Sequence, residues 1–373
     1  MSRRQELGEL ARLFLVLGAL GFGGPPAHLA MFEQEAVQRK KWLTSEELLE
    51  LIGAANLIPG PNSTEVAFSI GLRRAGLPGM IVAGVCFILP AALITAGLAY
   101  AYVRFGALPS FSPFLFGTKA AIIGVIVGAT MRLAPAATKT LPLTLLGILA
   151  LILSVLNLPE VAILVACGLL AIPGSGQAKV TALGAWILAG RAAAAGAAMA
   201  IPVSLGGLFL FFLYVGATIF GGGFVLASYL QTGLVQNLGW LSSGQLLDAI
   251  TVGQVTPGPV FSTATFVGYL IGGPMGALVA TVGIFLPCFF LVPALHKLMD
   301  WARKHPNVPR FIDGVAVGAL GLMLAVAIKL APASLDGWFA VSLAVGAGLA
   351  TVYRINAGLV VLVAGLLGYL TRL

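Results

Sequence analysis

The chain is 373 residues long, with 59% hydrophobic residues, 9% charged residues and a mean hydropathy of +1.02. This composition excludes a soluble globular protein, whose core could not bury so much apolar surface, and it predicts an all-α polytopic membrane protein. Basic loops that meet anionic membrane lipid account for the formal net charge of +8, so nucleic-acid binding is not required.

The start of the chain, MSRRQELGELARLF, alternates charged and apolar residues and lacks a small-residue cleavage site. We expect it to belong to the first helix rather than to a removed signal peptide. Apolar runs near the roughly 20 residues that cross about 30 Å of hydrocarbon follow it. They lie at 80–102, 122–133, 141–156, 161–172 and 180–200.

Glycine and proline interrupt two apolar segments near their middle. Residues 9–38 contain GFGGPP at 21–26, and residues 44–73 contain PGP at 59–61. Proline lacks an N–H group and disfavours helix in the residue before it, while glycine allows a sharp turn. One half-helix should therefore end and another begin at each break. Such turns are either packing kinks or the lining of a polar cavity, since irregular backbone at membrane depth cannot face lipid.

Both motifs occur twice. The PGP motif recurs at 257–259, which is 198 positions later, and the FGG motif at 22–24 recurs at 220–222 with the same offset. After one deletion the offset becomes 197 and matches LAP at 133–135 with LAP at 330–332. One register held along most of each half predicts two homologous repeats. The predicted domains are a first transporter repeat, a linker with one transmembrane helix and a second transporter repeat, at 1–175, 176–205 and 206–373.

The basic residues of the two copies favour inverted topology. Copy one carries RKK at 39–41 and RR at 73–74, where copy two is uncharged. Beyond the next span the basic residues are concentrated in copy two instead, at 297–310. Because Lys and Arg in short loops stay cytoplasmic, equivalent loops should face opposite sides of the membrane. Lys329, which matches Arg132, would fall on the outer side and counts against this interpretation.

The same charges predict how the first segments cross. Basic residues flank each of the segments 9–38 and 44–73 and should all lie on the cytoplasmic side of the membrane. Each segment should therefore enter the membrane and return to the same side, as broken or re-entrant helices. Full crossings with a surface helix at 44–57 are the alternative.

The half-helix after each break would point its N-terminus, with about +0.5 charge and unpaired N–H groups, at a cavity that suits an anion. Two inverted copies would bring such N-termini together near the midplane. The predicted substrate-binding residues are the glycines of the turns and the neutral polar residues beside them. They are Gly23, Gly24, Asn56, Gly60, Asn62, Ser63, Thr64, Gly221, Gly222, Gln254, Gly258, Ser262 and Thr263.

Charged and titratable residues near the breaks have two interpretations each. Glu65, which copy two replaces with Thr263, is either a proton-coupling group or a helix-start acid held by capping geometry. His28 either titrates near neutrality or makes a packing hydrogen bond. We expect Lys119 to extend to the outer face of the membrane and Asp248 to face the membrane interface.

Sequence motifs of the common enzyme classes are absent. The chain has no HExxH, GxSxG or Walker motif and no Cys/His cluster, so we expect no enzymatic activity, metal site or cofactor. Its cysteines, Cys86, Cys167 and Cys288, lie in apolar segments and are expected to be structural thiols.

These motifs resemble the chromate ion transporter family. The resemblance rests on FGGPPAH at 22–28, LIPGPNSTE at 57–65, FGGG at 220–223 and GQVTPGPVFSTATFVGYL at 253–270. It implies a two-domain inner-membrane protein of inverted halves that exports chromate, driven by the membrane potential or a proton gradient, with sulfate as the close analogue. A passive anion channel and a sulfate uptake transporter stay open as alternatives, as does a homodimer. Copy two lacks the prolines of the first turn, so the two turns need not act identically.

Overall fold

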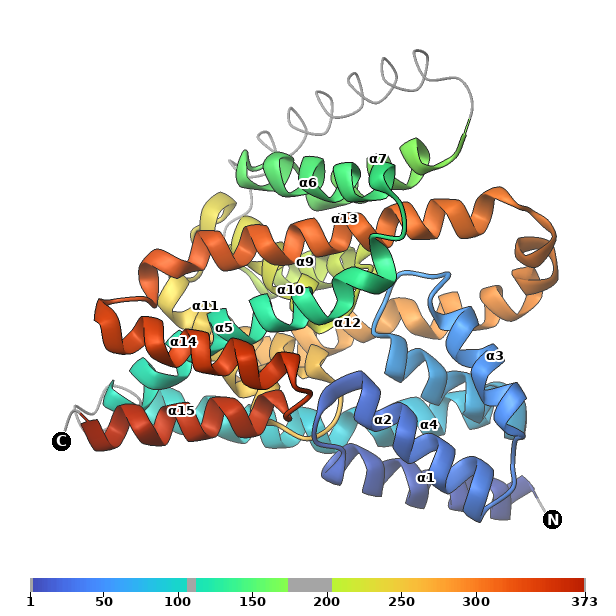
Figure 1. Ribbon diagram of the computed structural model, residues 1–373. Coiled ribbons are helices and arrows are strands. Elements are labelled where there is room, and N and C mark those ends of the chain that lie inside the picture. The colour runs from blue at the N-terminus through green and yellow to red at the C-terminus, as the bar shows by residue number, and fades with distance from the viewer. Residues whose placement is uncertain (1–2, 106–111, 174–202, 372–373) are drawn as a thin grey trace. The chain divides into compact units, whose positions relative to one another are not determined.

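A computed structural model describes the protein at residues 3–105, 112–173 and 203–371. All regular structure in these ranges is helical, which confirms the all-α prediction (Figure 1). Within them, four helical stretches are long and apolar enough to cross a membrane: Asn62–Phe105, Ser112–Ala137, Val260–Lys297 and Asn307–Ala333. The predicted span at 180–200 and nearly all of the linker at 176–205 lie outside the described residues.

The helices of the first half follow the predicted segments. They are α1 (Arg3–Leu20), α2 (Gly24–Phe32), η1 (Glu33–Arg39), α3 (Ser45–Ala55), α4 (Asn62–Phe105), α5 (Ser112–Ala137), α6 (Leu141–Val155) and α7 (Glu160–Ala171).

The second half has matching elements. They are α9 (Leu205–Thr218), α10 (Gly223–Leu230), η3 (Gln231–Asn237), α11 (Ser243–Val255), η4 (Val260–Ser262), α12 (Thr263–Lys304), α13 (Asn307–Leu330), η5 (Ala331–Ala333), α14 (Gly337–Val352) and α15 (Ala357–Thr371).

The breaks fall where glycine and proline predict them. Helix α1 ends before the first glycine turn and α2 begins inside it, while the first PGP motif separates α3 from α4. In the second half the corresponding breaks separate α9 from α10 and α11 from η4. The predicted broken helices are thereby confirmed.

Finer details also repeat between the halves. The segments η1 and η3 are both π-helical and lie 198 positions apart. Helices α4 and α12 each bend at a glycine in the left-handed region, Gly76 with φ 67° and Gly273 with φ 61°. The two arms then pack closely, because Gly71 lies against the Gly79 carbonyl and Gly268 against the Gly276 carbonyl. A side chain at these positions would separate the arms.

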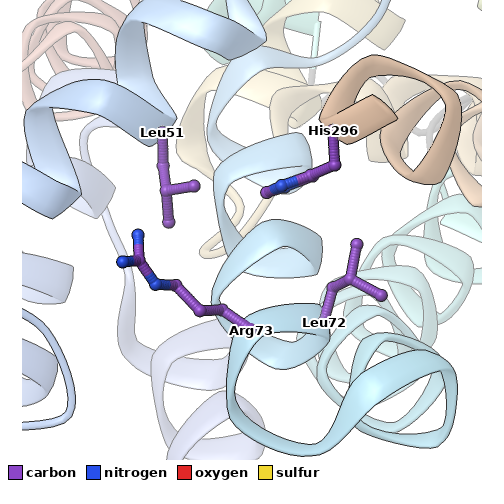
Figure 2. Close-up of a pocket in the computed structure, with 4 residues that line it drawn as sticks. All are labelled: Leu51, Leu72, Arg73 and His296. Atoms are coloured by element: carbon purple, nitrogen blue, oxygen red, sulfur yellow. The ribbon is translucent and has the colours of Figure 1, made fainter. Parts of the chain in front are cut away.

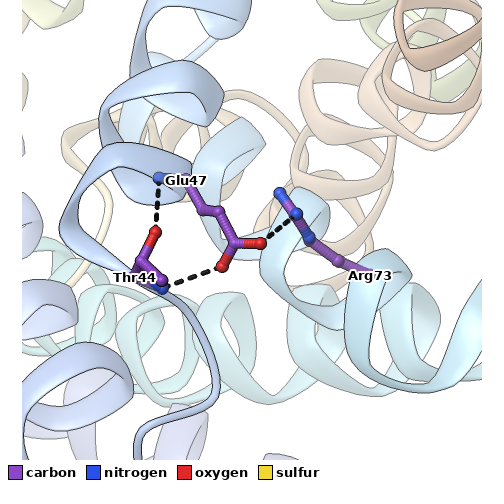
Figure 3. A network of polar contacts seen from close by, with 3 residues as sticks. All are labelled: Thr44, Glu47 and Arg73. Carbon is purple, nitrogen blue, oxygen red and sulfur yellow. Dashed lines mark hydrogen bonds and ion pairs between the residues drawn. The ribbon is translucent and has the colours of Figure 1, made fainter.

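The helix after each π-helical segment begins with a capping box, as Figure 3 shows for α3. The Thr44 amide donates to Glu47 Oε2 at 2.8 Å, and the Glu47 amide donates to Thr44 Oγ1 at 3.1 Å. Ser242 and Gln245 repeat this geometry at α11, at 2.9 and 3.1 Å. Copy one adds an ion pair, because Arg73 also binds Glu47. The cap therefore needs an oxygen acceptor but no charge.

The chain forms two compact units, and each draws helices from both halves of the sequence. Unit 1 comprises Met1–Phe105, Leu208–Thr218 and Val252–Trp301, and unit 2 comprises Gly106–Gly207, Ile219–Thr251 and Ala302–Leu373. Helices α1 to α4 thus share unit 1 with α9 and most of α12, while α5 to α7 share unit 2 with α10 and α13 to α15. The compact units do not coincide with the predicted repeats, whose boundaries stay a prediction about the sequence.

An aromatic cluster in unit 1 supports the first glycine turn. The rings of Phe14, Phe32 and Phe87 meet edge to face with centroids 5.7 to 6.1 Å apart. The His28 ring lies on the same Phe87 ring at 5.2 Å. These apolar contacts fix the imidazole while its two nitrogens point to polar partners.

Candidate functional site

The first glycine turn joins both PGP turns within unit 1. The Gly21 carbonyl accepts a hydrogen bond from the Gly258 amide at 2.9 Å and faces His28 Nε2 at the same distance. His28 Nδ1 lies 3.1 Å from Ser63 Oγ, which follows the first PGP motif. Turns that are far apart in the sequence are therefore linked through one carbonyl and one imidazole.

The turns use the conformations that glycine allows. Gly60 has φ 145°, Gly258 has φ 82°, and Gly23 and Gly24 have φ 111° and 70°. Neighbouring atoms also leave no room for a side chain at the two PGP glycines. A Cβ at Gly60 would overlap Glu65 Oε1, and one at Gly258 would come within 2.7 Å of the Gly18 carbonyl oxygen. Side chains are thus excluded at the two PGP glycines by both conformation and packing.

Two of the predicted hydroxyl donors already use their protons. The Nε2–H of His28 donates to the Gly21 carbonyl, so Nδ1 of a neutral imidazole accepts and the Ser63 hydroxyl donates to it. Thr263 Oγ1 donates to the Val260 carbonyl at 2.8 Å, which ties the start of α12. These two hydroxyls serve the protein's own structure.

The other two hydroxyls have a proton that takes part in no hydrogen bond of the described residues. Thr64 Oγ1 is buried and has no hydrogen-bond partner. Ser262 Oγ accepts from Thr95 Oγ1 at 3.2 Å, which leaves its own proton available. Thr64 and Ser262 lie 198 positions apart and so occupy equivalent places after the two PGP motifs.

Glu65 is fully buried beside the first PGP turn. Its side chain is 0% exposed, and neither carboxyl oxygen has a hydrogen-bond partner. The capping geometry of a helix-start acid is therefore not formed. Cys288 Sγ approaches the same glycine, at 3.4 Å from where a Gly60 Cβ would lie. An unpaired carboxylate in such surroundings costs several kcal/mol, so this group suits the uptake and release of a proton.

The remaining predicted residues divide into two groups. Asn62 donates to Asn56 across the first PGP turn, and Gln254 is half-buried on α11. Gly221 and Gly222 have φ 98° and 87° but belong to unit 2, where Gly221 faces Ala319. The second glycine turn therefore belongs to unit 2, whereas the linked turns belong to unit 1.

A cavity of about 300 Å³ lies in unit 1 between side chains of α3, α4 and α12. Leu51, Leu72, Arg73 and His296 surround it, as Figure 2 shows. Nε2 of His296 is buried without a hydrogen-bond partner. Nothing in the sequence indicated this cavity, because the single histidine of α12 follows a long apolar run and meets the other three residues only in the fold.

One expectation for a charged residue is wrong. Asp248 is 2% exposed rather than interfacial, and its Oδ2 lies 3.1 Å from Lys119 Nζ. The extension of Lys119 to the outer face of the membrane stays a prediction. A third buried acid, Glu160, was not predicted at all and lies near Ser228, Thr232 and Lys329 in unit 2. In the described part of the chain, no group of three or more His, Cys, Asp or Glu side chains is placed to hold a metal ion.

Comparison with known proteins gives a consistent result. The family model described as "Chromate transporter" matches residues 8–172 and again 206–369. A "Chromate transport protein" of Cupriavidus metallidurans is 33% identical over 88% of this chain and 84% of its own length. One of Pseudomonas aeruginosa is 32% identical over 97% and 92%, and a "Probable chromate transport protein" of Synechococcus elongatus is 32% identical over 88% and 86%. No solved structure is similar.

Proposed function

Because the chain belongs to the chromate transporter family, we propose that it is a secondary active transporter that exports chromate across the inner (plasma) membrane. Sulfate-like oxyanions are the expected analogues. The chain is a multi-pass membrane protein by its long apolar helices, and relatives of nearly full length are transport proteins by name. The driving force is the membrane potential or a proton gradient.

The linked turns of unit 1 carry this proposal. Each PGP turn begins a helix whose dipole favours negative charge. The Thr64 and Ser262 amides already donate to the Pro61 and Pro259 carbonyls, so the two N–H groups before each of them are the donors proposed for a ligand. The free hydroxyl protons of Thr64 and Ser262 stand beside these two helix starts. A tetrahedral dianion offers four oxygens to such donors. Neutral donors would hold it without the deep trapping that paired arginines would cause, so release stays fast enough for transport.

Half-helices of this kind would reach only the middle of the bilayer. Helix α3 has 11 residues, or about 17 Å at 1.5 Å per residue, against about 30 Å of hydrocarbon. The arm of α4 before the bend at Gly76 is similarly short. The short arm of α4 favours a re-entrant hairpin over a full crossing, whereas the length of α3 fits both a half-helix and a surface helix.

Glu65 would couple the anion to a proton. A carboxylate beside the first PGP turn repels a dianion, whereas the protonated group does not, so proton and oxyanion should bind together rather than in exchange. Such joint binding favours the membrane potential as the driving force for export, because an inside-negative potential still expels the remaining net negative charge.

Transport in sealed vesicles tests the function. Purified protein should move chromate against its concentration gradient when a membrane potential is imposed, and sulfate should compete for the same sites. A pH gradient imposed without a potential separates the two driving forces. Flux that only equilibrates chromate under every gradient would support a passive anion channel instead.

A further inference from the structure

Unit 2 contains a buried carboxylate that the proposed oxyanion site does not use. Glu160 begins α7 directly after Pro159 and is 5% exposed. Its carboxyl group lies close to the hydroxyls of Ser228 and Thr232, which are one helical turn apart on α10 and η3, and within electrostatic reach of Lys329 on α13.

The packing of α7 against α13 explains why these residues meet. Gly314 of α13 lies against the Cys167 backbone, and Gly318 lies against Cys167 and Leu164. The contacts move back along α7 as they move forward along α13, so the two helices run antiparallel. This register carries the start of α7 toward the Lys329 end of α13. The turn before α10 also packs on α13, since Gly221 faces Ala319.

Several polar atoms of this cluster lack hydrogen bonds. Glu160 Oε1, Gln231 Oε1 and Lys329 Nζ are buried without a hydrogen-bond partner. Glu160 and Lys329 do not form a direct ion pair within 4 Å. Buried polar groups are nearly always satisfied, and an ionisable group inside a membrane protein marks an ion or proton pathway by default. The π-helical segment η3 begins at Gln231, and such segments are frequent at functional sites.

The fold itself does not require this carboxylate. At the offset of 197, Glu160 matches Ala357, which begins α15 in the same way that Glu160 begins α7. Ser228 likewise matches Ala30 at the offset of 198. Copy one supplies the carboxylate of Glu160 and copy two the hydroxyl of Ser228. The equivalent helices, α15 and α2, form with alanine at these positions.

We propose that Glu160 is a proton-binding site in unit 2, separate from the oxyanion site, with Lys329 as the counter-ion of the carboxylate form. Lys329 is the charged group that faces Glu160 from α13, whereas α10 and η3 contribute neutral groups and α6, which also packs on α7, has no titratable side chain. The nearby Lys329 ammonium disfavours sodium binding at the Glu160 oxygens but is compatible with reversible protonation of the carboxylate. A coupling role for this proton rests on the proposed function, whereas proton binding itself does not.

Infrared difference spectra of the purified protein between low and high pH test the binding. Glu160→Gln should remove one protonated-carboxyl band that Glu65→Gln leaves in place, and exposed Glu46→Gln should remove neither. Lys329→Met should move the titration midpoint of that band while Glu160 itself is retained. This second variant keeps the test valid if Glu160→Gln does not fold. A spectrum that Glu160→Gln or Lys329→Met leaves unaltered would overturn the proposal.

Vesicle transport tests the coupling. The wild-type rate should change by up to about tenfold per pH unit across the titration, and Glu160→Gln should flatten this dependence while chromate affinity stays within twofold. A sodium gradient should not change the rate of chromate transport. If sodium does drive transport and Glu160→Gln abolishes this effect, the site binds sodium rather than a proton. If the wild type moves no oxyanion while the infrared band titrates, the proposed function fails and the proton site stands.

Discussion

The two PGP turns of unit 1 share a backbone and differ in their side chains. Both glycines have positive φ, and both turns are followed three residues later by a hydroxyl with a free proton, Thr64 or Ser262. The positions around these hydroxyls have diverged. Copy one has Ser63 and Glu65 where copy two has Phe261 and Thr263. The shared features are those that the proposed oxyanion site requires, whereas the imidazole link and the buried acid belong to copy one alone.

The largest expected difference between the copies is the side of the membrane on which equivalent loops lie. An impermeant reagent added to one side should label a position on that side and leave its equivalent in the other copy unlabelled. Gln38 and Gln236 are equivalent positions at the offset of 198. In a chain without the native Cys86, Cys167 and Cys288, single cysteines at these two positions should react with an impermeant reagent from opposite sides. Labelling of both from the same side would contradict inversion and indicate parallel repeats.

Substitution of the turn glycines should have the next largest effect. Gly60→Ala introduces a Cβ that overlaps Glu65, in addition to the strain of φ 145°, and should lower the free energy of unfolding by about 2–4 kcal/mol. Gly222→Ala is the matched control, because its φ is 87° but nothing lies within 4 Å of its Cβ. That variant carries only the strain of its backbone, about 1–3 kcal/mol, and should lose less than Gly60→Ala. Equal losses in a thermal unfolding assay would show that packing at the PGP turn is unimportant.

The comparison of hydroxyls predicts which donors bind the anion. Thr64→Val and Ser262→Ala each remove a free proton and should weaken chromate affinity by about 1.5–3 kcal/mol, or roughly tenfold or more. Ser63→Ala and Thr263→Val remove protons that the protein already uses and should change affinity by less than about threefold. Affinity would be measured by equilibrium binding to purified variants. Equal losses in both pairs would place the ligand elsewhere.

Glu65 should affect pH dependence more than affinity. Glu65→Gln keeps the shape of the side chain and removes its titration, so the pH dependence of chromate binding should weaken. Thr263 occupies the equivalent position in copy two, and Thr263→Glu offers a matched gain of a carboxyl group. Binding by the Glu65→Gln variant that keeps the full pH dependence would leave Glu65 with a structural role.

Local signals in the sequence predicted the breaks but not their partners. Glycine and proline determine where helices end, so all four turns follow from adjacent residues. Contacts such as Gly258 with Gly21, or Cys288 with Gly60, depend on how distant segments pack. No periodicity in the sequence reveals that the compact units mix the two halves.

The burial of charged groups was equally hidden. Asp248 lies in an amphipathic stretch and reads as interfacial, yet its partner Lys119 is on another helix. Glu160 follows a proline at a helix start, where an acid is ordinary. A sequence places a charge on a helix, but only the packing of neighbouring helices decides whether water reaches it.

The capping boxes provide the smallest predicted effect and separate the structural role of Glu47 from its charge. Gln245 forms the same cap in copy two without an ion pair. Glu47→Gln should therefore keep the cap and lose only the partly exposed pair with Arg73, at a cost of about 0–1 kcal/mol. Glu47→Ala also removes the oxygen that accepts from the Thr44 amide and should cost more, about 0.5–2 kcal/mol in total. Thermal unfolding of both variants, at low and high salt, distinguishes these terms, because only the ion pair is screened by salt. A Glu47→Gln variant as unstable as Glu47→Ala would mean that the charge, rather than the cap, holds the start of α3 against α4.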